Sequence, residues 1–177
     1  CPMRSLADAA AWPDCIRGLG TRYGFAVRWH YQNIARCRPF DITAGCTNGD
    51  CLTHQLNRQL ALLADRNQPA QVRLEALGFA AHLTGDLHQP LHVSDSGDRG
   101  GNETRVRFGI DPQAVQSLHR IWDRELSERA LTDVPVVTPA TFSAAQRARW
   151  RGGTIADWVA ASWALSSTNV YGKLPAL

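Results

Sequence analysis

Apolar residues recur at helical spacing in five segments of the chain, which predicts a mostly helical protein. We expect helices over residues 5–18, 52–64, 69–87, 113–126 and 154–166. In the second segment the apolar positions are leucines three or four residues apart. The third begins at Pro69, which suits a first helical turn, and Pro90 stops it. The core-facing stripes are expected at Val72, Ala76, Phe79, Ala80 and Leu83, at Val115, Leu118, Trp122 and Leu126, and at Ile155, Trp158, Val159 and Trp163.

The segments between these helices have weaker patterns. Residues 23–34 are patterned as either a strand or an extended loop, and residues 36–50 contain enough Pro, Gly and Asn to predict a loop. A Gly-rich turn is expected over 95–102, a short strand over 104–108 and a linker-like loop over 132–138. With no internal repeat, the 177 residues predict an all-α fold in a single domain, 1–177.

Histidine and aspartate side chains recur at a spacing that suits a metal ion. His82 and Asp86 are four residues apart, His92 follows the proline stop, and His119 and Asp123 form a second pair. Residues four apart project from the same face of a helix, so each pair can contact one ion. Imidazole with carboxylate is a ligand set that zinc accepts in hydrolytic sites. The pattern therefore predicts a multinuclear zinc hydrolase.

A single histidine is more often a hydrogen-bonded core or surface residue than a ligand. For His54 and His88 we adopt that interpretation. The candidate ligands are His30, His82, Asp86, His92, His119 and Asp123, with Asp14 a weaker candidate. A whole set arising by chance would need several independent coincidences.

Composition and charge add little to this prediction. Apolar residues make up 44% and charged residues 20%, as in ordinary soluble proteins. The formal net charge of +3 suits an anionic substrate such as a phosphodiester, but a solvated surface with a slight arginine excess explains it equally well. No apolar run approaches the length of a membrane span, and no leader opens the chain, so a leader was either removed or never present.

The five cysteines all lie in the first third of the chain, at Cys1, Cys15, Cys37, Cys46 and Cys51. Cys46 and Cys51 flank a Thr-Asn-Gly-Asp turn and are the first candidate disulfide. Cys15 with Cys37 is the second, which leaves Cys1 unpaired. A zinc-thiolate cluster is the alternative, but the spacings are irregular and no Cys-x-x-Cys occurs. Disulfides are favoured, and they predict an exported protein, secreted or periplasmic.

Several segments resemble the S1/P1 nuclease family, secreted zinc enzymes related to bacterial phospholipase C. The matching segments are SLADAAAWPD at 5–14, WHY at 29–31, CTNGDC at 46–51, HLTGDLHQPLH at 82–92, GGN at 100–102, LH at 118–119 and WD at 122–123. A looser similarity covers 158–171. The resemblance implies a helical domain of the phospholipase C and P1 nuclease type, with a zinc cluster at the bottom of a cleft.

Two zinc sites follow from this resemblance. One would be held by Asp14, His30, His82 and Asp86, and the other by His92, His119 and Asp123. The family holds a third zinc, bridged to the first by Asp86, with an amino-terminal Trp and a nearby His. This sequence begins at Cys1, immediately before the first matching helix, and contains no Trp-x-x-x-x-His, so we expect the third site to be incomplete. The amine and thiol of Cys1 are a conceivable replacement.

The resemblance also assigns roles around the metals. Asp14, Arg17 and Asp86 would be catalytic, with Arg17 steadying charge on the phosphate. Tyr31 would stack on a base, Asn33 would bind the base edge, and Asn102 would lie beside the scissile phosphate. The sequence Asn102-Glu-Thr is formally a glycosylation acceptor, which we discount because the resemblance places it inside the cleft.

The implied activity is zinc-dependent cleavage of single-stranded DNA or RNA and of 3′-nucleotides, leaving 5′-phosphates. We expect a monomer without stable membrane association. A phospholipase C acting on lipid head groups and a non-catalytic, zinc-stabilised homologue are the alternatives. An HD-type phosphohydrolase does not fit, because no His-Asp dipeptide occurs.

Overall fold

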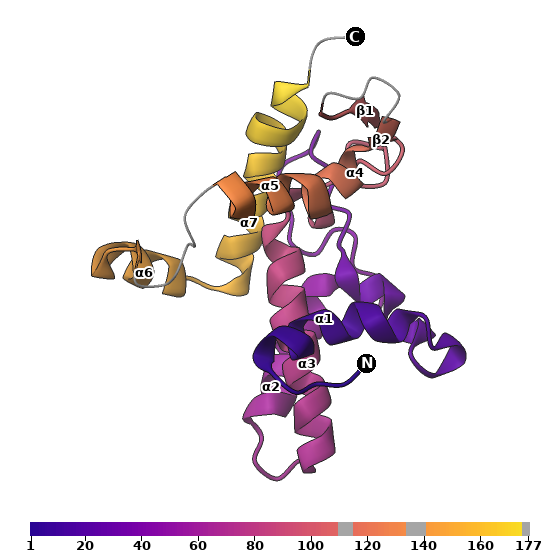
Figure 1. Ribbon diagram of the computed structural model, residues 1–177, viewed down its shortest axis with the longest axis vertical. Coiled ribbons are helices and arrows are strands. Elements are labelled where there is room, and N and C mark those ends of the chain that lie inside the picture. Colours follow the sequence, from indigo (N-terminus) through magenta and orange to yellow (C-terminus); the bar gives the residue numbers. More distant parts are fainter. Residues whose placement is uncertain (110–114, 134–140, 175–177) are drawn as a thin grey trace.

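The helix expected in the middle of the sequence is also central in space. The computed structural model describes residues 1–109, 115–133 and 141–174. Helix α3 (Ala70–His88) runs along the long axis of the molecule, and α1 (Leu6–Arg17) and α2 (Leu52–Ala64) pack against it (Figure 1). In the described residues the only sheet has two short strands, so the prediction of an all-α fold is confirmed.

Helix α1 has the ends that its sequence predicts. The hydroxyl of Ser5 accepts a hydrogen bond from the backbone N–H of Asp8, which satisfies a free donor of the first turn, and Gly18 caps the other end. Trp12, on the buried face, meets the rings of Tyr23 and Phe79 edge to face, with centroids 5.5 Å apart in each pair. This aromatic cluster holds α1 against α3, and so fixes the helix that carries Asp14.

The predicted stripe on α3 is buried. Ala76, Phe79, Ala80 and Leu83 are all shielded from solvent, and Val72 is half-buried. Full burial of a leucine such as Leu83 contributes roughly 1.5–3 kcal/mol. Pro69 lies at the N-cap and not in the first turn, so the helix begins at Ala70. At the other end the chain turns at Gln89 into a short 3-10 helix, η3 (Pro90–His92).

Residues 20–30 form 3-10 helices, η1 (Gly20–Arg22) and η2 (Gly24–His30), so the choice between strand and loop was wrong for this part. The buried positions explain the difference. Tyr23, Ala26 and Trp29 are three residues apart, which is the repeat of a 3-10 helix and matches neither an α-helix nor a strand. From Tyr31 the backbone becomes extended, as expected.

The expected helix at 113–126 begins later than its apolar pattern suggests. Residues 115–117 form strand β2 (Val115–Ser117), which pairs antiparallel with β1 (Arg105–Arg107), within the predicted strand. Ser117 then caps α4 (Leu118–Arg120), because its hydroxyl accepts from the N–H of Arg120. A π-helical turn, η4 (Ile121–Glu125), and α5 (Leu126–Asp133) follow. The first two residues of the loop expected at 132–138 belong to α5, and its remainder lies outside the described residues.

Helix α6 (Ala144–Arg151) was not expected, because none of its residues is buried and it has no apolar stripe. Its capping box, Ser143 with Gln146, is visible in the sequence. Helix α7 (Ile155–Leu165) was expected. Its Val159 is buried, and the chain continues through a π-helical turn, η6 (Ser166–Val170), into η7 (Tyr171–Lys173).

The disulfides are Cys1–Cys15 and Cys46–Cys51, while Cys37 is free and exposed. The Cys46–Cys51 prediction is confirmed, and the Cys15–Cys37 prediction is wrong. The segment before α1 folds back so that Cys1 reaches Cys15, with 5.8 Å between the Cα atoms. Because its sulfur is bonded to Cys15, Cys1 does not offer the metal-binding thiol considered for it.

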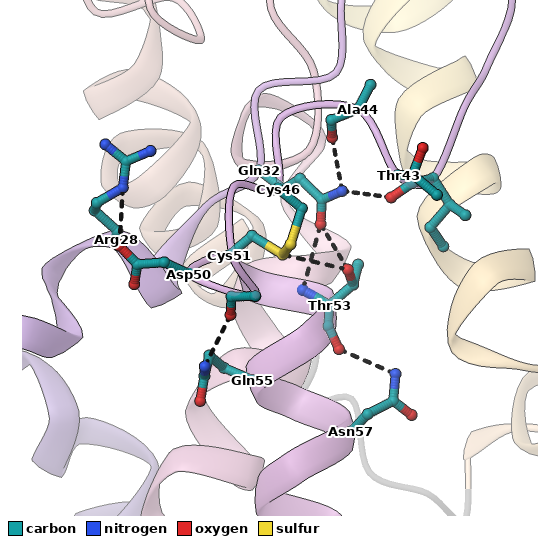
Figure 2. Close-up of a disulfide and its surroundings, with 12 residues drawn as sticks. Arg28, Gln32, Thr43, Ala44, Cys46, Asp50, Cys51, Thr53, Gln55 and Asn57 are labelled. Atoms are coloured by element: carbon teal, nitrogen blue, oxygen red, sulfur yellow. Dashed lines mark hydrogen bonds and ion pairs between the residues drawn. A yellow bond between two sulfur atoms is a disulfide. The ribbon is translucent and has the colours of Figure 1, made fainter.

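The Cys46–Cys51 disulfide closes a loop that a buried glutamine fastens to the rest of the fold (Figure 2). The side-chain amide of Gln32 donates to the carbonyls of Ile42 and Ala44, at 2.6 and 2.8 Å. Its oxygen accepts from the hydroxyl of Thr53 at 2.6 Å. All polar atoms of this buried side chain therefore have hydrogen-bond partners. These bonds also fix the backbone of the two flanking residues, Tyr31 and Asn33.

Candidate metal centre and cleft

A cleft of about 680 Å³ gathers the site residues expected from the sequence. Ten of them line it: Asp14, Arg17, His30, Tyr31, Asn33, Asp86, His92, Asn102, His119 and Asp123. The remaining one, His82, contacts the wall residue His30, with His82 Nε2 2.9 Å from His30 Nδ1. These residues come from helices and loops across the first 123 positions, so the fold brings them together.

Three elements contribute the first group of candidate ligands. Asp14 comes from α1, His30 from the end of η2 and His82 from α3, and one ligand atom of each lies within 4.8 Å of the others. Asp14 Oδ1 is 3.7 Å from His30 Nδ1 and 3.8 Å from His82 Nε2. The same Asp14 oxygen is 2.9 Å from the guanidinium of Arg17, one turn further along α1.

The second group consists of His92, His119 and Asp123, whose ligand atoms also lie within 4.8 Å of one another. His92 Nε2 is 3.1 Å from Asp123 Oδ1, and His119 Nε2 is 3.2 Å from Asp123 Oδ2. His119 and Asp123 are four residues apart where α4 passes into η4, so both side chains reach the same face. The pairing expected from their spacing is therefore present.

Asp86 lies between the two groups. Its Oδ2 atom is 3.2 Å from His30 Nδ1 and 3.1 Å from His82 Nε2, while its Oδ1 atom is 3.5 Å from His92 Nδ1. Oδ2 is buried and has no hydrogen-bond partner of good geometry in the described part of the chain. A buried carboxylate oxygen in this position is costly unless a cation compensates it.

Three of the imidazoles are oriented by backbone carbonyls. The Nδ1 atoms of His82, His92 and His119 donate to the carbonyls of Ala10, His30 and Gly100, at 2.7 Å in each case. A carbonyl can only accept, so Nδ1 carries the hydrogen and Nε2 presents its lone pair to the ligand group. Such outer hydrogen bonds are typical of metal-binding histidines.

The electrostatics of both groups favour a bound cation. In the neutral rings, the Nε2 lone pairs face carboxylate oxygens, so acceptors oppose acceptors. Burial alone would lower the pKa of His82 and of His92, yet Asp86 raises the pKa of His82, and Asp123 with Asp86 raises that of His92. Burial would likewise raise the pKa of Asp86, but the rings of His30 and His82 hold it at about 2. A divalent cation among these donors would resolve each conflict, so the side chains fit a metal ion.

Gln89 is a site residue that the sequence reasoning missed. Its side-chain amide donates to Asp123 Oδ1 at 2.7 Å, and its oxygen accepts from the N–H of Leu91 at 2.6 Å. Gln89 thus fixes one oxygen of a candidate ligand. Its position between His88 and Pro90, inside the motif that ends at His92, was the available indication. Arg99 and Trp122 also line the cleft and were not expected.

The predicted substrate contacts Tyr31, Asn33 and Asn102 all line the cleft, from two different segments of the chain. Tyr31 and Asn33 are half-buried in the extended segment after His30, and the N–H of Leu52 donates to the Tyr31 carbonyl at 3.2 Å. Asn102 lies on the Gly-rich turn, where its amide donates to the carbonyl of Arg99 at 2.9 Å. His54 and His88 belong to neither ligand group, and His88 is exposed with its ring bonded to the Thr84 carbonyl.

Fold and site together define a helical protein whose cleft could hold metal ions between histidine and aspartate side chains. The family model described as S1/P1 Nuclease matches residues 2–174. The chain therefore belongs to the S1/P1 nuclease family, as its motifs predicted.

Proteins named as nucleases are among its relatives. It is 42% identical over 138 residues to Endonuclease 1 of Arabidopsis thaliana, covering 72% of this chain and 44% of that protein. With Endonuclease 3 of the same plant it shares 31% over 132 residues, covering 71% and 44%. With Nuclease S1 of Aspergillus oryzae it shares 26% over 153 residues, covering 84% and 51%. The chain thus spans about half the length of the curated relatives it matches.

Proposed function

We propose that the cleft is the active site of a zinc-dependent phosphodiesterase. Its substrates would be single-stranded DNA or RNA and 3′-nucleotides, and its products would carry 5′-phosphates. The observation that carries the proposal is the convergence of two His–Asp groups, with Asp86 between them, in a cleft that also contains Arg17 and Asn102. Membership of the S1/P1 nuclease family supports it.

The proposed metal ligands are Asp14, His30, His82 and Asp86 for one zinc and His92, His119 and Asp123 for another. Imidazole and carboxylate donors at three or four positions suit Zn²⁺ in a hydrolytic site. Zinc ions bound there would supply positive charge to the phosphate oxygens and would lower the pKa of the attacking water.

Two further side chains would act on the phosphate. The guanidinium of Arg17 lies at the cleft wall, half-exposed, where it can pair with a phosphate oxygen as well as with Asp14. Asn102 is held by the Gly-rich turn and also lines the cleft, so its amide can donate to the same anion. Asp86, whose pKa is held at about 2, stays ionised at neutral pH and preserves the negative charge that retains the cations.

Tyr31 and Asn33 favour a nucleotide over a lipid head group. An aromatic ring at the cleft wall can stack on any base, but only if the base is unpaired, which points to single strands. An amide beside it can bind the edge of that base. No described helix has both the length and the apolar content that a membrane crossing needs.

The two disulfides support the proposal of an exported protein, because such bonds persist in oxidising compartments. Secreted and periplasmic locations both meet that condition.

The function can be tested with the purified chain and a labelled single-stranded oligonucleotide, with added zinc and with a chelator. We expect cutting only with zinc and 5′-phosphate ends on the products. A His119→Asn variant should lose the activity, whereas His54→Asn, the same change outside both ligand groups, should keep it. Equal activity of both variants would contradict the assignment of the cleft. If the protein hydrolysed phosphatidylcholine and did not hydrolyse nucleic acid, the phospholipase C activity would replace the nuclease activity as the proposed function.

A further inference from the structure

The two-stranded ribbon formed by β1 and β2 is joined at both ends to residues that line the cleft. Strand β1 begins three residues after Asn102, and strand β2 ends two residues before His119. Three residues of extended chain reach at most about 11 Å, so the base of the ribbon lies near the cleft rim. In Figure 1 the ribbon stands beside α4, on the opposite side of the view from α6.

One face of the ribbon is packed and the other is open. Val106 contacts the small core cluster around Leu91 and Leu118, so its side of the ribbon faces the protein. Directly opposed residues of paired strands share a face, and the register pairs Arg105 with Ser117 and Arg107 with Val115. Arg105, Arg107 and Val115 are exposed. We call this side the arginine face of the ribbon.

In the part of the chain that the structure describes, no carboxylate lies within ion-pair distance of the arginine face. Within the described residues, neither Arg105 nor Arg107 forms an ion pair, and the described positions of β1 and β2 include no acidic residue. Nearby arginines behave differently: Arg120 pairs with Glu125 at 3.1 Å and Arg124 with Glu128 at 2.9 Å. Among the described residues, the two strand arginines are thus without an ion-pair partner, whereas these two helical arginines are each paired with a glutamate.

The spacing of these cations suits a chain of phosphates. Residues i and i+2 of a strand are about 6.8 Å apart on one face, which is comparable with the separation of neighbouring phosphates in an extended single strand. Arg99, whose side chain is 79% exposed and lies 4.0 Å from the Glu103 carboxylate, lines the cleft and belongs to the turn that leads into β1. Arginines at 99, 105 and 107 therefore run outward from the cleft along one stretch of chain.

We propose that the arginine face binds the phosphates of a nucleic-acid strand beyond the nucleotide held in the cleft. The surface is thus an extended binding site for polynucleotides, and it would not contact a mononucleotide. This inference rests on the proposed function for the identity of the strand in the cleft.

The test compares Arg105→Gln/Arg107→Gln with Arg149→Gln/Arg151→Gln, a control that removes the same charge from the exposed surface of α6. Binding of a hydrolysis-resistant phosphorothioate oligothymidylate by the zinc-loaded chain is measured by fluorescence anisotropy at several salt concentrations. Each phosphate contact on a single strand contributes about 0.7 to the slope of log affinity against log salt, so the ribbon variant should lose about 1.4. Between about 50 and 200 mM salt, wild-type affinity should then fall about sevenfold more than that of the variant.

Hydrolysis separates this inference from the proposed function. We expect the ribbon variant to cleave adenosine 3′-monophosphate like wild type but to show a raised KM for a long oligonucleotide, while the control matches wild type on both. Equal salt slopes for ribbon variant and control would overturn the role of the arginine face and leave the nuclease proposal standing. If the ribbon variant shows the expected loss of salt slope but wild type hydrolyses neither substrate, the nuclease proposal would be overturned and the arginine face would stand as a binding surface.

Discussion

A single methyl group at Gly100 tests how the Gly-rich turn supports the metal centre. Gly100 has φ +61°, and a Cβ there would lie 2.5 Å from the carbonyl oxygen of Leu91. The Gly100 carbonyl accepts the 2.7 Å hydrogen bond from His119 Nδ1. A Gly100→Ala substitution should therefore strain the turn and move the group that orients a proposed zinc ligand.

Gly97 provides a matched control in the same turn. It also has positive φ, +85°, but a Cβ there meets no atom within 4 Å. Both residues donate their N–H to Asp95 Oδ1, at 3.1 Å for Gly100 and 3.0 Å for Gly97. The cost of a left-handed alanine, about 1–2 kcal/mol, is common to both, and so is the gain from a less flexible unfolded chain.

The difference between the variants isolates the contact with Leu91. Relieving a 2.5 Å approach to a backbone oxygen requires a backbone shift that costs roughly 1–3 kcal/mol more. Loss of an outer hydrogen bond typically lowers metal affinity about 10–100-fold. We expect urea unfolding to give Gly100→Ala the lower midpoint, and chelator competition to show weaker zinc binding for that variant alone. Equal stability and equal zinc affinity for the two variants would refute this reasoning.

Three further predictions concern two side-chain hydrogen bonds and a disulfide. Replacing Gln89 by Ala frees one oxygen of Asp123, so zinc affinity measured by chelator competition should fall about 10–100-fold; unchanged affinity would show that Gln89 does not orient the ligand. The Tyr171→Phe variant loses a 2.7 Å hydrogen bond to Asp98, and should be less stable by about 1–3 kcal/mol at pH 7. Burial would raise the pKa of Asp98, yet its hydrogen bonds lower this pKa below 3.8. The stability that ionised Asp98 contributes is therefore full above the unfolded-state pKa and is lost as the pH falls through the folded-state pKa. The difference in stability between variant and wild type should shrink in thermal unfolding at acid pH, and a constant difference would contradict this. Removing the Cys46–Cys51 disulfide with serines should cost about 2 kcal/mol in urea unfolding, from the short loop that it closes, with zinc content unchanged.

The helices with buried apolar stripes were predictable from sequence. The stripe of α3, which includes Phe79 and Leu83, recurs at helical spacing, and the burial of these residues confirms it. Helix α6 lacks such a stripe, because it buries nothing, and it was missed. Residues 24–30 were missed for a different reason, since a three-residue repeat fits neither template used. Strand β2 depends on its partner β1, a long-range pairing that the local pattern at Val115 does not contain.

The candidate site was predicted in part by spacing and in part by resemblance. Spacing alone gives the pairs His82–Asp86 and His119–Asp123, because residues four apart share a helix face. Asp14 and His30 meet His82 only because three separate elements pack together. The resemblance to the family motifs predicted this grouping, whereas the periodicity of the sequence could not. The Cys1–Cys15 bond likewise depends on how the amino-terminal segment folds back.

The electrostatics of the site could not be predicted from the sequence. The lowered pKa of Asp86 and the ring orientations set by the carbonyls of Ala10, His30 and Gly100 exist only in the folded chain. They explain why the side chains of the cleft are arranged for a cation, and they add a physical reason to the motif match.

Anomalous X-ray diffraction at the zinc absorption edge, from crystals grown with zinc, tests the central claim most directly. The account predicts one peak among Asp14, His30, His82 and Asp86 and a second among His92, His119 and Asp123. Absence of both peaks from the cleft of an intact, zinc-saturated protein would contradict the account.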